Sequence, residues 1–94
     1  MKSVYTDAYA MFLQRLIDAR KRAGMSQMRL ASRLAKPQSF ISKYETGERR
    51  LDITEFLHIV YMVRADPHAM IDEVVKAAPE LRTRRRKPPV KRDT

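Results

Sequence analysis

The sequence contains no cysteine, only two glycines and only two histidines. Without cysteine the chain can form neither disulfides nor cysteine-ligated zinc sites. So few glycines argue against an architecture of strands joined by tight turns. No stretch approaches the roughly 18 apolar residues of a membrane span, and acidic Asp7 interrupts any signal-peptide pattern near the start. These absences favour a helical, cytoplasmic protein with no membrane association.

Signatures of catalysis are also missing. The sequence has no phosphate-cradling glycine loop, and neither Ser39 nor Ser42 has a histidine nearby to activate it. Glu55 and His58 have the spacing of half a di-iron carboxylate motif, but no second copy exists. We interpret these two residues as a pair on a helix surface. We therefore expect no enzymatic activity, no metal site and no cofactor.

Positive charge is abundant, because 20 basic and 11 acidic residues give a net charge of +9. Such a surface attracts polyanions, nucleic acids among them. Residues 79–94 alone carry a net +5 and have only Leu81 and Val90 as sizeable apolar side chains. This segment cannot bury enough surface to offset the entropy of ordering, so we expect a disordered basic tail. Its role is either solubilisation or additional phosphate contacts.

Apolar periodicity and capping residues predict an all-α fold of five helices in residues 1–78. Ser26 is a candidate N-cap, Asp52 and Glu55 have capping-box spacing, and Asp66 followed by Pro67 is typical of a helix start. Gly24 and Gly47 are suited to helix C-termini. The predicted segments are 6–23, 26–34, 37–46, 52–63 and 66–77.

The second and third segments are short and close together, which suggests a helix-turn-helix over residues 27–46. Ala31 is small where the two helices would cross, and Leu34, Ile41 and Tyr44 would form the apolar wedge between them. The outward face of the third segment then carries polar side chains that suit base edges in the DNA major groove. These side chains are Gln38, Ser39, Ser42 and Lys43.

Four motifs resemble the Cro/repressor-type helix-turn-helix family, also called XRE-like. They are AGMSQ at 23–27, LASRL at 30–34, PQSFISKYETGERR at 37–50 and DITEF at 52–56. The resemblance spans residues 13–71 and implies a five-helix bundle of the phage-repressor DNA-binding type. We therefore expect a DNA-binding domain at 1–78, followed by the basic tail at 79–94.

The resemblance also implies roles for individual residues. Gln27 matches a residue that holds a phosphate oxygen, and Gln38 matches the leading base-reading glutamine. Arg20 and Glu45 match an ion pair that ties the first helix to the recognition helix, so we interpret them as structural. The remaining matches to base and DNA-backbone positions are Ser39, Ser42, Lys43, Arg49 and Arg50.

Three positions depart from the family pattern. Ala35 and Arg64 stand where the family usually has glycine, so either a strained or a distorted turn is expected at Ala35. Phe40 is large for a reading helix. It either packs against the turn or contacts a thymine methyl group, and we favour packing.

The fourth segment has more apolar residues than one buried stripe can use, from Ile53 to Val63. It is either enclosed in a tight bundle or buries a second face in a homodimer. We favour the homodimer, because a short recognition helix gains from two half-sites about 34–36 Å apart.

These observations predict a sequence-specific transcriptional regulator of duplex DNA, a repressor that binds a palindromic operator as a homodimer. One alternative is a protein-interaction module of the same fold, antitoxin-like or an anti-activator, that binds a protein partner. Another is an RNA-binding protein led by the tail. We disfavour it because the deep, narrow RNA major groove does not admit a helix's side chains.

Overall fold

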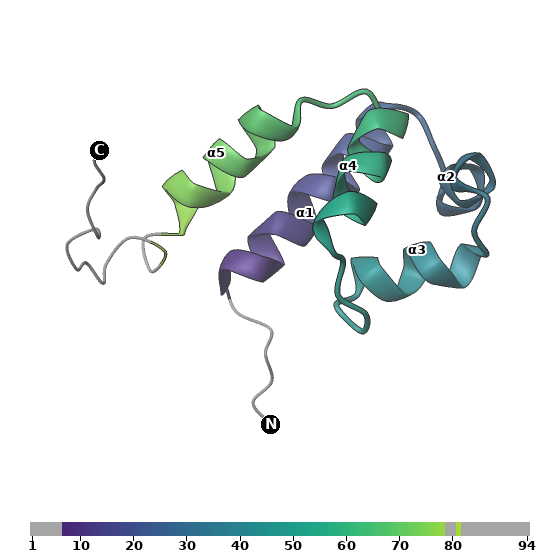
Figure 1. Ribbon diagram of the computed structural model, residues 1–94, viewed down its shortest axis with the longest axis horizontal. Coiled ribbons are helices and arrows are strands. Elements are labelled where there is room, and N and C mark those ends of the chain that lie inside the picture. The colour runs from purple at the N-terminus through teal and green to yellow at the C-terminus, as the bar shows by residue number, and fades with distance from the viewer. Residues whose placement is uncertain (1–6, 79–80, 82–94) are drawn as a thin grey trace, which may run out of the picture.

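The computed structural model describes residues 7–78 and Leu81, and in that part of the chain it contains five α-helices and no strand (Figure 1). The all-α prediction is therefore confirmed. Apart from Leu81, the predicted tail at 79–94 lies outside the described residues, as does Thr6. The helices are α1 (Asp7–Arg22), α2 (Gln27–Leu34), α3 (Gln38–Glu45), α4 (Ile53–Met62) and α5 (Pro67–Ala77).

Local capping residues set the starts of three helices. The Ser26 hydroxyl accepts a hydrogen bond from the Arg29 N–H at the start of α2, at 3.0 Å. Asp52 and Glu55 form the expected capping box on α4, with each side chain accepting from the other residue's backbone N–H. Asp66 accepts from the His68 N–H at the start of α5. These caps satisfy backbone donors that have no partner within the helix.

The ends of α1, α2 and α4 share one type of turn. In each, a residue with a left-handed backbone is followed by an N–H that bonds to the carbonyl five residues back. Gly24 adopts this conformation without strain, with φ of 75°. Ala35 and Arg64 adopt it with φ of 57°, which costs a side-chain-bearing residue roughly 1–2 kcal/mol. The turn at Ala35 is thus regular and strained rather than distorted.

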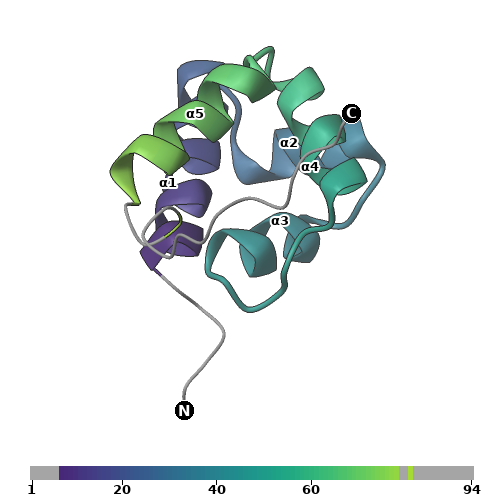
Figure 2. The same ribbon diagram turned by 60° about the vertical axis from the view of Figure 1, so that its left-hand side comes forward.

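The core lies where α1 packs against α3 and α5, and where α2 packs against α3 and α4 (Figure 2). Ile41 and Tyr44, predicted to point inward, are fully buried. Burial of one large apolar side chain of this kind contributes about 1.5–3 kcal/mol. The largest fully buried side chains are Tyr44, Leu13, Leu16, Leu30, Ile41, Ile59 and Val60.

The Tyr44 hydroxyl is buried and has no hydrogen-bond partner among the described residues. Burial is the main cause of a raised pKa for this phenol, with a further contribution from the charge of Glu45. Tyr44 therefore stays protonated and neutral in the core, beside the charged side chain of Glu45.

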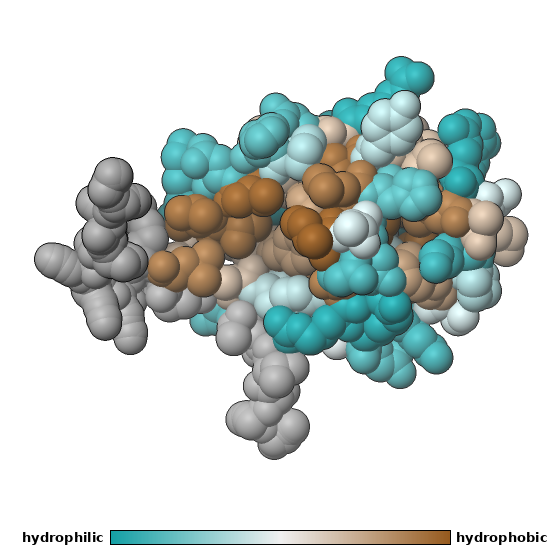
Figure 3. Space-filling model, in the orientation of Figure 1, coloured by the Kyte–Doolittle hydropathy of each residue, from teal (hydrophilic) through white to brown (hydrophobic). Residues whose placement is uncertain are grey.

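One face of α4 is not covered by the rest of the described chain. Phe56, Ile59 and Val60 are buried, whereas Ile53, Leu57 and Tyr61 are 62%, 45% and 78% exposed. The interpretation of α4 as a fully enclosed helix is therefore wrong for the single chain. Figure 3 shows hydrophobic surface over the middle of the molecule, bordered by hydrophilic residues.

None of the described helices is both long enough and apolar enough to cross a membrane.

Candidate nucleic-acid interface

The recognition edge, defined as Gln38, Ser39, Ser42 and Lys43, lies on the outer side of α3. Gln38, Ser39 and Lys43 are exposed and Ser42 is half-buried. The opposite side of the same helix carries Phe40, Ile41 and Tyr44, all buried. Packing of this apolar side fixes the rotation of α3, so the polar edge faces outward.

A chain of hydrogen bonds leads from the interior to the recognition edge. Arg20 Nε and Nη2 donate to the two carboxylate oxygens of Glu45, at 2.7 and 3.1 Å. Gln27 Nε2 donates to the same carboxylate at 2.8 Å. Gln38 Nε2 then donates to the Gln27 carbonyl oxygen at 3.1 Å. Gln38 is thus positioned by a chain that begins on α1.

The first link of this chain is a buried ion pair between α1 and α3. The side chains of Arg20 and Glu45 are only 9% and 5% exposed. Arg20 also donates to the Met25 carbonyl oxygen at 2.9 Å, which adds the α1–α2 connection to the same cluster. The two residues that the resemblance pairs are therefore in direct contact, and they tie the recognition helix to the rest of the bundle.

The hydrogen bond to Gln27 leaves part of the Gln38 amide available. A primary amide has two N–H donors and a carbonyl oxygen. One N–H is used by Gln27, so one N–H and the carbonyl oxygen remain. These are the two groups that bond to N7 and N6 of adenine in the major groove.

Gln27 takes part in the interface as a positioning residue in this structure. The resemblance assigned it to a phosphate oxygen, and here its amide joins Glu45 to Gln38. Gln27 donates one of its two amide N–H groups to Glu45, so the other is still available. The phosphate contact stays a prediction.

The loop after α3 holds Arg49 in a second ion pair. Arg49 Nη1 and Nη2 donate to the two oxygens of Glu55, at 3.0 and 2.9 Å. These hydrogen bonds are the main cause of a lowered pKa for the Glu55 carboxyl group. Among the described residues, Glu55 forms its hydrogen bonds and ion pair with Arg49 and Asp52, and not with His58. In residues 7–78, no group of three or more side chains could hold a metal ion.

Aromatic rings hold the basic side chains next to α3. The Arg49 guanidinium lies 4.9 Å and the Lys36 ammonium 5.1 Å from the centre of the Phe40 ring. Phe40 also makes an edge contact with Tyr44 and is buried, so it packs as expected. The Arg50 guanidinium lies 4.2 Å from the centre of the Tyr9 ring. These contacts are cation–π interactions, and they place positive charge beside the recognition edge.

Two short helices with an exposed polar edge on the second define a helix-turn-helix DNA-binding domain. The helix-turn-helix domain family matches residues 12–73. A solved XRE-family like protein from Pseudomonas syringae pv. tomato str. DC3000 is 42% identical to this chain, with a TM-score of 0.72. The match covers 77% of this chain and 88% of the other. The chain therefore belongs to the XRE-like helix-turn-helix family, and it is a DNA-binding regulator. Among curated proteins, none matches it.

Proposed function

We propose that this protein is a repressor of transcription that reads a palindromic operator in duplex DNA as a homodimer. The observation that carries this proposal is the ordered Gln38 amide at the recognition edge. A side chain that is already positioned loses less conformational freedom on binding, which favours specific recognition. Gln38, Ser39 and Lys43 would specify the sequence. Positioning on the DNA backbone would fall to Gln27, Ser42, Arg49 and Arg50.

The decisive experiment is the selection of bound sequences from random duplexes at physiological salt. We expect a palindromic site with two half-sites one helical turn apart. Gln38→Ala should then weaken binding to the selected site by ~1–3 kcal/mol and leave non-specific binding nearly intact.

The control is Gln14→Ala, the same substitution at an exposed position on α1. It should change neither the affinity for the selected site nor the affinity for random duplexes. An equal loss on selected and random duplexes after Gln38→Ala would show that Gln38 does not read a base.

The homodimer is supported by the exposed apolar stripe of α4, Ile53, Leu57 and Tyr61. These residues are four positions apart, so they lie in one row along the helix. A contiguous apolar row of this kind is typical of an interaction surface. We assign it to a second copy of this chain, because α3 has only eight residues and one such helix covers only a short half-site.

Leu57→Glu tests this assignment by placing a charge in the stripe. Sedimentation should show loss of the dimer, and binding to the selected duplex should lose its cooperativity. Ile71→Glu is the matched control, because Ile71 is equally exposed but lies on α5. A dimer that survives Leu57→Glu would rule out this interface.

A second candidate function uses the same stripe. If the stripe binds a different protein, the chain is an antitoxin-like or anti-activator module. That reading requires that no duplex sequence is enriched in the selection, and that Leu57→Glu abolishes co-purification of one defined protein.

Repression itself is tested with a reporter whose promoter overlaps the selected site. We expect reduced expression with the wild-type protein and restored expression with Gln38→Ala. Higher expression with the wild type would identify an activator instead.

A further inference from the structure

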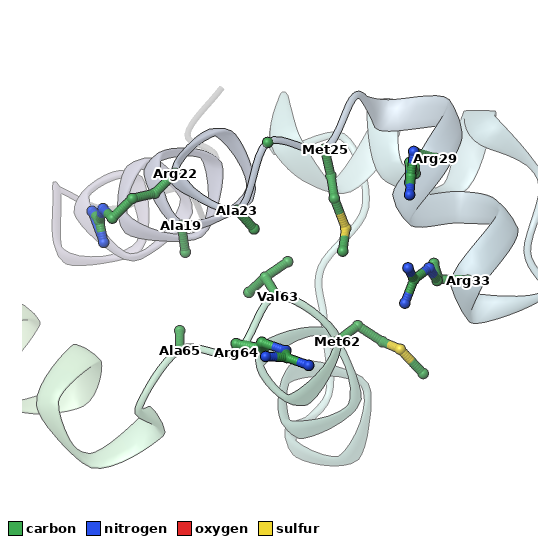
Figure 4. Close-up of a pocket in the computed structure, with 11 residues that line it drawn as sticks. Ala19, Arg22, Ala23, Met25, Arg29, Arg33, Met62, Val63, Arg64 and Ala65 are labelled. Carbon is green, nitrogen blue, oxygen red and sulfur yellow. The ribbon is translucent and has the colours of Figure 1, made fainter.

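A cleft of about 600 Å³ lies between the ends of α1 and α4 and the side of α2 (Figure 4). Its base is apolar and includes Met25, Met62 and Val63. In Figures 1 and 2 the connections that border it lie at the end of the molecule opposite α3. The cleft is therefore separate from the recognition edge. None of its lining residues is acidic. Four of them are arginines: Arg22, Arg29, Arg33 and Arg64.

The positive charge of this cleft is not neutralised by the described part of the chain. Within residues 7–78, the basic members of the ion pairs are Arg15, Arg20, Arg49 and Lys76, and no arginine of the cleft takes part. Arg29 and Arg33 lie one turn apart on α2, where like charges repel each other. The arrangement is unfavourable for the free protein and becomes favourable when an anion is bound.

Arg64 supplies a second, independent observation. It occupies the left-handed position after α4, with φ of 57°, whereas the matching turn after α1 at the same cleft uses glycine. Glycine would adopt this backbone conformation without strain. In Figure 4 Arg64 lies beside Met62 at the end of α4, whereas Arg29 and Arg33 lie on α2 across the cleft, and all three line it. A strained residue of this kind is often found at a ligand site.

Arg22 has an ordinary structural explanation. It lies in the last turn of α1, where a cation interacts favourably with the helix dipole. The argument for a ligand therefore depends on Arg29, Arg33 and Arg64.

We propose that the cleft binds a small phosphorylated molecule of about nucleotide size. Its phosphate groups pair with Arg29, Arg33 and Arg64, because the planar guanidinium donates two parallel hydrogen bonds to phosphate oxygens. Its apolar part lies on Met25, Met62 and Val63. The volume is within the range of small-molecule sites, about 300–1,000 Å³. This site is independent of the function proposed for α3.

The test titrates the full chain with ATP, inorganic pyrophosphate and adenosine, at physiological salt, by calorimetry and thermal unfolding. We expect one ATP per chain and a raised Tm, weaker binding of pyrophosphate because it lacks an apolar part, and no effect of adenosine. Arg64→Gly should weaken ATP binding by about tenfold or more, since a charge-assisted hydrogen bond is lost. The same substitution relieves backbone strain, so the unliganded variant should be at least as stable as the wild type.

The matched control is Lys76→Ala, which removes one exposed positive charge from α5, away from the cleft. It should bind ATP as the wild type does. Equal weakening in the two variants would mean general charge attraction and would overturn the proposal. The absence of any binding of ATP or pyrophosphate would also overturn the proposal. Equal affinities for ATP and pyrophosphate would overturn the role assigned to the apolar base.

Duplex DNA is the competing source of phosphate. If Arg64→Gly leaves ATP binding unchanged but makes duplex binding less salt-dependent, by about one phosphate contact, the arginines bind the DNA backbone and the proposal is wrong. The Gln38→Ala experiment reports on α3 alone, so its failure would leave this result intact.

Discussion

Two arginine–glutamate pairs flank α3, and they differ mainly in their exposure to water. The side chains of Arg20 and Glu45 are 9% and 5% exposed, whereas those of Arg49 and Glu55 are 43% and 21% exposed. Both pairs use two parallel hydrogen bonds of similar length. Because their geometry is alike, burial decides what each pair contributes.

The inner pair, Arg20 and Glu45, is out of reach of solvent and so holds α3 in one orientation. The outer pair, Arg49 and Glu55, is at the surface, where water and salt compete with it. On the proposed function, a DNA phosphate would replace the Glu55 carboxylate as the partner of Arg49. The inner pair therefore positions α3, and we propose that the outer pair exchanges its carboxylate for a phosphate when DNA binds.

Of the variants that test this comparison, Glu45→Ala should have the largest effect on the free energy of unfolding. It leaves the Arg20 guanidinium buried without a counterion, and loss of one partner of a buried pair costs ~3–5 kcal/mol. Urea denaturation should show this loss in the free energy of unfolding. Glu55→Ala is the matched substitution in the outer pair and should cost much less, even though it also removes a capping contact. Equal losses would mean that burial does not distinguish the pairs.

Replacing the inner pair by apolar residues should separate stability from positioning. Arg20→Met combined with Glu45→Leu should restore near-wild-type stability, because well-packed apolar side chains can replace a buried ion pair. Gln27 then loses its acceptor, so Gln38 is less well ordered. Binding to the selected duplex should fall by about tenfold, as expected for one lost hydrogen bond. Wild-type affinity in this variant would contradict the role of the hydrogen-bond chain.

Arg49→Gln should make DNA binding less salt-dependent. It removes the guanidinium that would exchange the Glu55 carboxylate for a phosphate. The slope of log K against log salt concentration should become shallower by about 0.9. Lys76→Gln, at an exposed lysine of α5, is the control and should leave the slope unchanged. An unaltered slope in Arg49→Gln would mean that Arg49 makes no exchange.

Acid should remove the stability that the outer pair contributes, and the Tm measures this loss. The pKa of Glu55 is lowered from its usual 4.5, chiefly by the hydrogen bonds from Arg49. A carboxyl group whose pKa is lower in the folded state stabilises the protein above its unfolded pKa. That stabilisation is lost as the pH falls from about 4.5 through the folded pKa. The Tm of Glu55→Gln should fall less than that of the wild type over this range, and parallel curves would refute the assignment.

The sequence predicts the helices well because their ends depend on local chemistry. Ser26, Asp52 and Asp66 bond to N–H groups only two or three residues away. A cap of this kind can be recognised from spacing alone. The buried side of α3 also follows from periodicity, and so does the excess of apolar residues on α4.

Contacts between side chains of different elements are less accessible to prediction. The sequence predicts Arg49 on DNA, and its partner in the structure, Glu55, lies six residues further on, across the loop that leads into α4. The contact of Gln27 with Glu45 joins two different helices. The arginine cleft draws on α1, α2 and the end of α4. Such contacts depend on how helices pack, which periodicity does not specify.

The left-handed alanine between α2 and α3 has a consequence for how this domain tolerates change. At Ala35, glycine would relieve the strain and asparagine or aspartate would tolerate it, whereas valine, isoleucine and threonine would clash with their own backbone. A library randomised at this codon and selected for folding should therefore be enriched in small and flexible residues and depleted of β-branched ones. Position 35 thus limits which sequences can evolve in the connection between α2 and α3.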